Sequence, residues 1–473
     1  MIASDRLNQV FNAQWQKPAL IVEDRSFSYA ELYAHAGAIR DWLEQQGCRS
    51  GDSVALRLPN GWVFASAYLA CILGNYQAVP VNIELHQDDQ EYIIRRTEAR
   101  IVLCEEELLA GLQPIEANHP NFAFPADEVA AVFFTSGTTG RPKGVCHTLD
   151  ALVGNARAFN QSMGLDASTR LYHCLPMAYM AGFLNTLLSP WMAGGVVLLG
   201  ARFRPVDALT FWTKPLAWGA NTIWLTPMIA GILVRMSRDS GLASKVGESM
   251  RQVFCGTAPL PLVMRQSFQK TFGCPLQESY GMSEVLLVSA QIRAEAEVSA
   301  GVGRLLPGLR LSFRALPEGG GSELVIHTPF SLTGYMLEDG ETSPLLPDGG
   351  MPSGDTAEVR DGSLVITGRL KDIIIRGGLN VSPVAVEGVL LREPGVREVS
   401  VVASPHDFWG EIIVACLVPE EGMDTCALQN RLRLRCASEL GEGMRPDRYV
   451  WLNALPRSST GKVQKHVLVG QLA

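Results

Sequence analysis

The sequence predicts an α/β protein with more than one domain. Its 473 residues exceed what a single hydrophobic core usually organises. Strand-like and helix-like segments alternate over residues 18–80, and the alternation returns over residues 372–473, which is typical of α/β domains. Apolar residues make up 47% of the chain and charged residues 19%, a composition expected of a folded protein with a large buried fraction.

Local patterns predict the first elements. Apolar runs predict strands at residues 18–22, 54–58, 78–81 and 129–134. Ser28 followed by Glu31 has the spacing of a capping box, so a helix should begin there and continue through Leu43. An Ala- and Leu-rich helix is expected over residues 65–74, and a shorter one over residues 105–112.

The last part of the chain predicts a compact unit with one short sheet. Strands are expected at residues 372–376, 399–402 and 412–418, and helices at residues 384–391 and 425–440. These alternating elements predict a small α/β domain.

Composition excludes several functions. The net charge of −8 argues against broad nucleic-acid binding, which needs a basic face. Ten cysteines occur without a Cys-x-x-Cys pair, and residues 1–5 do not resemble a secretory leader, so we expect reduced thiols and a cytoplasmic protein. The apolar stretch 63–73 ends well short of the roughly 20 residues that cross a bilayer.

A loop rich in Gly, Ser and Thr follows the strand predicted at residues 129–134. It reads Thr135, Ser136, Gly137, Thr138, Thr139, Gly140, Arg141, Pro142, Lys143 and Gly144. Glycines permit close backbone approach, hydroxyl and N–H groups can surround phosphate oxygens, and Arg141 and Lys143 add positive charge. Lys143 is followed by Gly144 and not by Ser or Thr, which excludes the nucleoside triphosphatase loop. The loop therefore predicts a different polyphosphate site.

These ten residues resemble the signature of the adenylate-forming superfamily, which includes acyl-CoA synthetases, adenylation domains and luciferases. The resemblance implies that the loop covers the β- and γ-phosphates of ATP while a carboxylate attacks the α-phosphate. It also implies a large N-terminal domain of several subdomains with mixed sheets, residues 1–370, and a small mobile C-terminal domain, residues 371–473. Lys371 is the expected hinge.

Further motifs resemble the superfamily in the expected order. Gly256, Thr257 and Ala258 match a segment that flanks substrate and adenine. The stretch Tyr280, Gly281, Met282, Ser283 and Glu284 resembles the second signature, with Ser283 where Thr is usual. The resemblance implies that Tyr280 stacks on adenine, the Ser283 hydroxyl bonds the α-phosphate and Glu284 holds Mg²⁺ as a hard oxygen ligand.

Three later residues complete the predicted nucleotide site by resemblance. Asp355 matches the residue that accepts both ribose hydroxyls, and Arg369 matches a partner of ribose and phosphate. Lys462 ends the closing motif at residues 456–462 and is expected to reach the carboxylate and the α-phosphate.

The acyl pocket is expected at Met177, Tyr179, Met180 and Gly182, where the chain resembles the pocket motif. Relatives often carry His in place of Tyr179, which can either bound the pocket or belong to the ordinary core. No Asp or Glu occurs between Asp166 and Asp207. A substrate ammonium would lack a partner there, so amino acids are disfavoured and an acyl or aryl acid fits better.

The motifs together predict ATP-dependent activation of a carboxylic acid to an acyl-adenylate, followed by thioester formation with coenzyme A. Gly377 and Gly378 leave room for a pantetheine arm, which favours coenzyme A. A carrier-protein pantetheine or an amine remains an alternative acceptor, and a nucleotide sensor without turnover is the alternative that is not an enzyme. The presence of Lys462 and Glu284 argues against the sensor.

Overall fold

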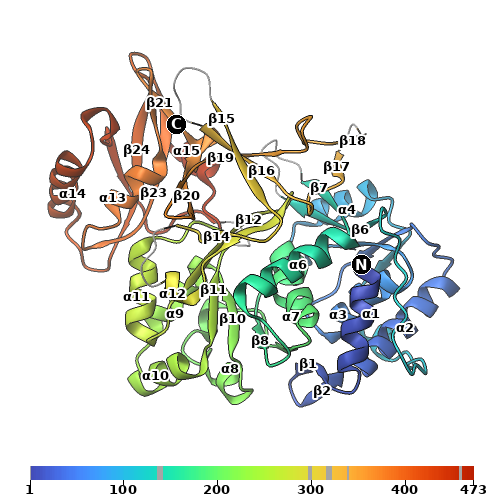
Figure 1. Ribbon diagram of the computed structural model, residues 1–473. Helices are drawn as coiled ribbons and strands as arrows, with labels where there is room; N and C mark the ends of the chain where they lie inside the picture. Colours follow the sequence, from blue (N-terminus) through green and yellow to red (C-terminus); the bar gives the residue numbers. More distant parts are fainter. Residues whose placement is uncertain are drawn as a thin grey trace.

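A computed structural model of the protein describes residues 2–135, 142–296, 301–315, 322–337, 340–457 and 461–472. Within these residues the strands form four sheets, of nine, seven, four and five strands. Figure 1 shows a large domain, drawn from blue through yellow to light orange, and a small domain, in darker orange and red, at the upper left. The predicted α/β class, with a large first domain and a small last one, is confirmed.

The nine-stranded sheet has a parallel centre and antiparallel ends. Strands β12, β11, β10, β8, β9 and β1 run parallel to their neighbours in that order. The bounds are β1 (Pro18–Val22), β2 (Arg25–Ser28), β8 (Arg170–His173), β9 (Val196–Leu199), β10 (Thr222–Leu225), β11 (Gln252–Cys255), β12 (Gln277–Met282), β13 (Leu286–Ala290) and β14 (Arg304–Leu305). Parallel neighbours bring the carboxyl ends of β8, β10, β11 and β12 to one edge, which is where α/β sheets usually bind ligands.

The seven-stranded sheet carries the predicted phosphate loop. Its order is β18-β17-β7-β6-β4-β3-β5. The bounds are β3 (Ser53–Leu56), β4 (Gln77–Pro80), β5 (Ile101–Leu103), β6 (Val129–Thr135), β7 (Lys143–Thr148), β17 (Gly334–Leu337) and β18 (Gly340–Thr342). The strands predicted at residues 54–58, 78–81 and 129–134 are confirmed as β3, β4 and β6, with ends that shift by one or two residues.

Helices join the two large sheets. The helix α6 (Leu149–Met163) contacts β6 and β7 of one sheet and β13 of the other, so it lies between them (Figure 1). The capping box predicted at Ser28 is confirmed, because the Ser28 hydroxyl accepts from the Glu31 N–H and the Glu31 carboxylate accepts from the Ser28 N–H. The other helices of the large domain are α1 (Ala3–Gln14), α2 (Tyr29–Gln45), α3 (Trp62–Leu73), α4 (Gln87–Arg96), α5 (Glu106–Ala110), α7 (Ser189–Met192), α8 (Thr213–Ala217), α9 (Pro227–Met236), α10 (Ser240–Ser249), α11 (Leu262–Phe272) and α12 (Arg293–Ala296), with a π-helix at Ala181–Leu188 and a 3-10 turn at Pro205–Asp207.

The four-stranded sheet lies next to the small domain. It consists of β15 (Arg310–Ala315), β16 (Ser322–His327), β19 (Met351–Arg360) and β20 (Ser363–Arg369). Asp355 of β19 pairs with Arg369 of β20 across the antiparallel ladder. This pairing places the two predicted ribose-binding residues side by side.

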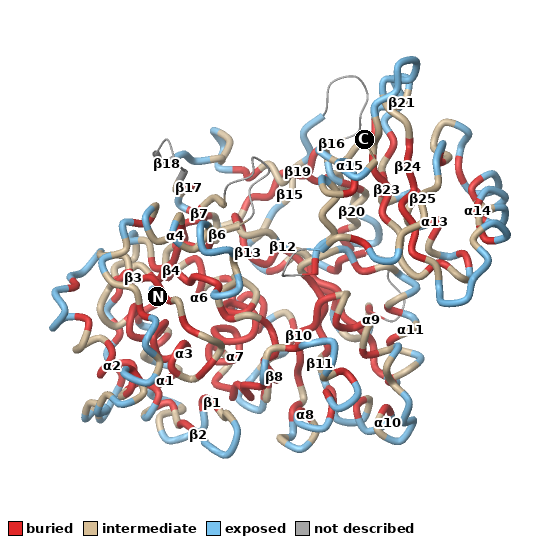
Figure 2. Tube along the Cα trace, turned by 180° about the vertical axis from the view of Figure 1, so that it is seen from behind, coloured by how far each residue is buried: buried red, intermediate tan, exposed pale blue. Residues whose placement is uncertain are grey.

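The small domain has its own sheet and its own core. Its elements are η4 (Leu370–Asp372), β21 (Ile374–Arg376), β22 (Leu379–Val381), α13 (Pro383–Leu390), β23 (Val396–His406), β24 (Gly410–Pro419), α14 (Thr425–Glu439), η5 (Glu442–Met444), β25 (Arg448–Trp451) and α15 (Lys465–Leu472). Among the described residues, the members of its two hydrophobic clusters all lie at or after Ile374 in the chain. The members of the large-domain clusters all lie at or before Ile366. Figure 2 shows buried residues gathered separately inside each domain.

The structure describes the state of the cysteines and the character of the helices. All ten cysteines are free thiols. Within the described residues, no helix combines the length and the apolar character that crossing a membrane requires.

Candidate active site

The predicted phosphate loop joins two strands that pair with each other. Thr135 at the end of β6 lies opposite Lys143 at the start of β7, so the two ends of the loop are held together. The predicted phosphate-binding residues Ser136, Gly137, Thr138, Thr139 and Gly140 lie outside the described residues. Their contact with ATP therefore stays a prediction.

Glu284, on the turn between β12 and β13, is held by two groups that meet the same oxygen. The Lys143 ammonium lies 3.1 Å from Glu284 Oε1, and the Tyr335 hydroxyl donates a 2.6 Å hydrogen bond to that oxygen. The Lys143 ammonium also lies 3.9 Å from the centre of the Tyr335 ring. The structure thus gathers a carboxylate, a cation and a hydroxyl at one end of the predicted loop.

Ser283 is anchored through its backbone by a buried histidine. His147 Nε2 lies 2.6 Å from the Ser283 carbonyl oxygen. Burial lowers the pKa of His147 to about 4, so the ring is neutral at physiological pH and its Nε2–H donates to the carbonyl. This bond fixes the second signature against β7.

Asp355 is a buried carboxylate between two donors. Its exposed fraction is 3%. The Tyr280 hydroxyl donates to Oδ2 at 2.6 Å, and Arg369 Nε lies 3.0 Å from Oδ1. Gly281 follows Tyr280 on the exposed end of β12. The three predicted residues Tyr280, Asp355 and Arg369 are therefore brought together.

The segment after β11 leaves buried polar atoms without partners. Thr257 adopts a positive φ of 73°, which is strained for a β-branched residue. Its Oγ1 and the Trp224 indole N–H are buried and have no hydrogen-bond partner among the described residues. A side chain at Gly256 would come within 2.6 Å of Ser279 Oγ, and Ala258 follows this turn. Orphaned polar atoms beside a bare backbone are what a ligand site provides.

Lys462 reaches this group from the small domain. Its pKa is lowered by burial and by the like charges of Arg369 and Lys371, while Glu284 and Asp355 act in the opposite direction. Its side chain remains exposed to solvent. Arg457 donates to the Gly461 carbonyl at 2.7 Å, and this bond steadies the backbone next to Lys462.

The predicted acyl-pocket residues lie on the segment between β8 and the π-helix. Met177 is fully buried, and its carbonyl accepts from the Tyr68 hydroxyl at 3.2 Å. Tyr179 is half-buried, and its hydroxyl accepts from Asn82 at 2.9 Å. Met180 is also half-buried, whereas Gly182 is buried and its carbonyl accepts from Thr186 Oγ1 at 2.9 Å. These contacts position the segment, and its role as a pocket stays a prediction.

The predicted hinge and the predicted thiol path lie in different places. Lys371 lies in η4, directly after β20, and its charge acts on Lys462. Gly377 and Gly378 form the turn between β21 and β22, with φ values of 58° and 82°. Two successive positive φ values are what a two-residue hairpin of type I′ requires, so the turn accounts for both glycines. Figures 1 and 2 show this hairpin at the end of the small domain remote from the large one.

Two residues that contact the site were missed in the sequence. His147 lies in the middle of β7, and Tyr335 lies in β17, whose pairing with β7 joins distant parts of the chain. Neither belongs to a signature stretch, and strand pairing over such a separation leaves no local signal.

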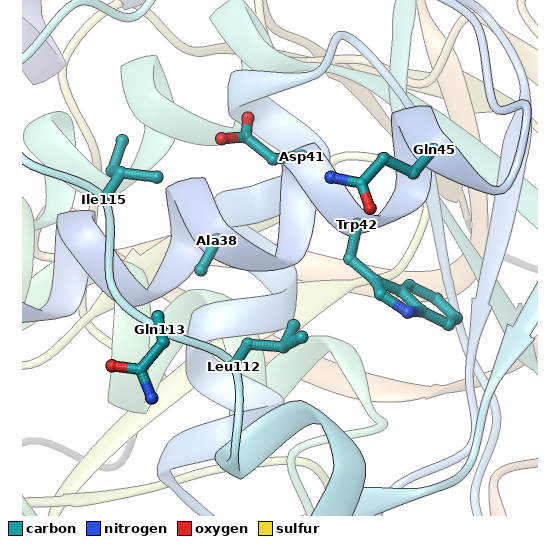
Figure 3. Close-up of a pocket in the computed structure, with 7 residues that line it drawn as sticks. All are labelled: Ala38, Asp41, Trp42, Gln45, Leu112, Gln113 and Ile115. Atoms are coloured by element: carbon teal, nitrogen blue, oxygen red, sulfur yellow. The ribbon is translucent and has the colours of Figure 1, made fainter.

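A cavity elsewhere contains none of the predicted site residues. It has a volume of about 240 Å³ and lies between α2 and the segment after α5 (Figure 3). Its lining consists of Ala38, Asp41, Trp42, Gln45, Leu112, Gln113 and Ile115. It is separate from the group formed around Glu284 and Asp355.

The fold and this group of residues define a protein with a large and a small domain, and the residues predicted to bind a nucleotide come from both. The family model of AMP-binding enzymes matches residues 7–336, and the model of their C-terminal domain matches residues 385–462. The chain therefore belongs to the family of AMP-binding enzymes, and the resemblance to the adenylate-forming superfamily is confirmed.

Several known proteins are similar over nearly the whole chain. A long-chain-fatty-acid–CoA ligase of Mycobacterium tuberculosis is 27% identical, over 94% of this chain and 93% of that protein. A sulfoacetate–CoA ligase of Cupriavidus necator is 28% identical, over 96% and 94%. The crystal structure of ATP-bound MatB from Rhodopseudomonas palustris is 25% identical and superposes with a TM-score of 0.86, over 100% of this chain and 99% of that one.

Proposed function

We propose that the protein is an AMP-forming acid–thiol ligase, which activates a carboxylic acid with ATP and then transfers the acyl group to coenzyme A. The observation that carries this proposal is the position of Lys462. Burial and the like charges of Arg369 and Lys371 lower the pKa of this ammonium, while Glu284 and Asp355 of the large domain raise it, as expected of a lysine that the small domain delivers to that group. The similarity to proteins named as CoA ligases supports the same reaction.

In the first step, an oxygen of the substrate carboxylate attacks the α-phosphorus of ATP, and the bond to pyrophosphate breaks. Both reactants are anionic, so their repulsion must be offset. We assign this role to Lys462, while Asp355 and Tyr280 hold the nucleoside and the loop from Thr135 to Lys143 holds the leaving pyrophosphate. The buried Thr257 Oγ1 and Trp224 N–H, which lack partners among the described residues, would gain them from the ligands.

The donor set also fits a magnesium ion that arrives with ATP. Glu284 offers a carboxylate beside the predicted phosphate loop, and the described residues contain no group of three or more His, Cys, Asp or Glu side chains that could form a complete metal cage. Mg²⁺ commonly binds through one or two carboxylates, with phosphate and water as its other ligands. Bound there, it would neutralise phosphate charge and orient the α-phosphate.

In the second step, a thiol sulfur attacks the acyl carbon, the thiol loses its proton and AMP leaves. Coenzyme A is the proposed acceptor. A carrier-protein pantetheine or an amine is the alternative acceptor. The acid is proposed to be an acyl or aryl acid without an ammonium group, since no Asp or Glu occurs between Asp166 and Asp207. The cytoplasmic location predicted from the cysteines stays a prediction.

Acid-dependent exchange of labelled pyrophosphate into ATP tests the proposal. The purified protein is incubated with a mixed pool of fatty, aryl and short carboxylic acids, and active acids are then tested singly with coenzyme A. The proposal expects exchange with at least one acid and a thioester with that same acid. Exchange without a thioester would favour another acceptor, whereas ATP binding without any exchange would favour the nucleotide sensor.

A further inference from the structure

The contact between Tyr335 and Glu284 involves a residue, Tyr335, that belongs to none of the predicted motifs. Tyr335 lies in the seven-stranded sheet and Glu284 on a turn of the nine-stranded sheet, 51 residues apart in the chain, yet the phenol donates to the carboxylate at 2.6 Å. The exposed fraction is 9% for Tyr335 and 8% for Glu284, so little water competes for this bond. Hydrogen bonds from a neutral donor to a buried charged acceptor are short and strong.

Strand pairing explains why the tyrosine is there. Tyr335 of β17 lies opposite Val145 of β7, and Lys143 is on the same face of β7 as Val145 because side chains alternate. The ring therefore lies diagonally across from Lys143, and the ammonium rests 3.9 Å from its centre. The Leu332 N–H also donates to the Glu284 carbonyl at 2.8 Å, so the chain leading into β17 is tied to Glu284 twice.

These contacts restrict the carboxylate. A glutamate on a turn can rotate about its side-chain bonds, but Tyr335 and Lys143 both meet Oε1. The ammonium belongs to the end of the phosphate loop and is expected to move to the phosphates when ATP binds. The Tyr335 hydroxyl has no such second partner in the reaction, so it alone would keep Glu284 oriented once ATP is bound.

We infer that Tyr335 is a positioning residue that fixes the Glu284 carboxylate for the cation of the ATP complex, acting through its hydroxyl. The inference rests on the nucleotide-binding part of the proposed function, because it takes Glu284 to be the cation ligand, and it does not depend on the later turnover. Groups that hold a metal-binding carboxylate typically contribute 10- to 100-fold to metal affinity. The ring of Tyr335 packs in the hydrophobic cluster of β16, β19 and β20, so Tyr335→Phe removes the hydroxyl and keeps the packing.

The test is calorimetric titration with a non-hydrolysable ATP analogue, once with Mg²⁺ and once with a chelator. The affinity with Mg²⁺ divided by the affinity with the chelator measures the contribution of the cation, and this measurement needs no turnover. For Tyr335→Phe we expect this ratio to fall by about tenfold, with unchanged affinity in the chelator. In pyrophosphate exchange, the Mg²⁺ concentration for half-maximal rate should rise similarly, and saturating Mg²⁺ should recover most of the rate. An unchanged ratio would overturn the inference, as would a wild-type protein whose analogue binding does not depend on Mg²⁺.

Tyr29→Phe is the matched control, because its buried hydroxyl donates to the Gly195 carbonyl at 2.7 Å in a part of the core remote from the site. It should lower the unfolding temperature and leave the Mg²⁺ ratio unchanged. Glu284→Gln should make the analogue affinities with Mg²⁺ and with the chelator equal. Adding Tyr335→Phe to this variant should not change the affinities further. A further loss in the double variant would show that Tyr335 acts by another route. Tyr335→Phe could lower the Mg²⁺ dependence of analogue binding as expected while the wild-type protein shows no pyrophosphate exchange. That result would refute the proposed function and leave the inference about Tyr335 standing.

Discussion

The Tyr280 hydroxyl donates a 2.6 Å hydrogen bond to Oδ2 of Asp355, so a predicted ribose ligand is oriented before any nucleotide is present. Asp355→Asn keeps an acceptor for this hydroxyl but replaces one carboxylate oxygen with an amide N–H₂, and removes the charge that faces Arg369. ATP should bind about 10- to 100-fold more weakly, the scale of a lost charged hydrogen bond. Calorimetric titration with ATP and 2′-deoxy-ATP measures this, and the variant should discriminate less between the two. Equal discrimination by both proteins would remove Asp355 from the ribose site.

Lys462→Ala should impair adenylation selectively. Lys462 is close to the charges of Glu284 and Asp355, whereas the β21–β22 hairpin with Gly377 and Gly378 lies at the remote end of the small domain (Figure 1). Removing one positioned charge should slow pyrophosphate exchange by at least about 100-fold. Thioester formation from a preformed acyl-adenylate should continue. If both half-reactions slow equally, the two roles are not separate.

Lys371→Pro should separate the two half-reactions. Proline fixes φ near −65° and removes an N–H, so a hinge at this residue would reach only one of two orientations. The present orientation has Lys462 at the site, so the variant should retain pyrophosphate exchange and lose most thioester synthesis with coenzyme A. Lys371→Ala is the control and should retain both. Full thioester synthesis by the proline variant would mean that the hinge lies elsewhere or that no rotation occurs.

Glu278→Gln should change how stability depends on pH. Burial raises the pKa of Glu278 to about 7 from an ordinary 4.5. Between these values the unfolded chain has lost the proton and the folded chain retains it, so stability falls as pH rises, by roughly 3 kcal/mol in total. Glutamine still accepts from the Leu260 N–H and does not ionise. Denaturant unfolding should therefore show that the free energy of unfolding of the variant, relative to that of the wild type, is higher at pH 8 than at pH 5. An equal difference at both values would contradict the prediction.

Tyr179→Ala should widen the range of acids. Tyr179 is half-buried, and its hydroxyl accepts from Asn82 at 2.9 Å. Loss of the ring would enlarge the predicted pocket, whereas Tyr179→Phe removes only the hydroxyl and should preserve the substrate profile. The pool of acids used for pyrophosphate exchange measures both. An unchanged profile for the alanine variant would assign Tyr179 to the core.

Local elements were predictable because their signals are local. The capping box at Ser28 and the apolar run at residues 129–134 each depend on a few adjacent residues, and both predictions are confirmed. Sheet order was not predictable. Strand β17 pairs with β7 across nearly 200 residues of chain, because burial in the whole molecule selects that partner. The sequence also contained no signal that predicted the π-helix at Ala181–Leu188.

The site divides in the same way. Tyr280, Asp355 and Arg369 were found from their motifs, and the structure brings them together. Tyr335 and His147 carry no motif of their own and matter only through contacts with Glu284 and Ser283. Residues that act on a site through another residue are determined by packing, so a single sequence does not reveal them.

The separation of the hydrophobic clusters has an energetic consequence for the proposed rotation of the small domain. Because no cluster of the described residues spans the boundary between Ile366 and Ile374, turning the small domain disrupts no apolar core. Only boundary contacts must break, such as the 2.6 Å hydrogen bond from the Ser382 hydroxyl to the Thr367 carbonyl, and water can replace such polar bonds at small net cost. Scanning calorimetry should accordingly resolve two cooperative units that melt at different temperatures.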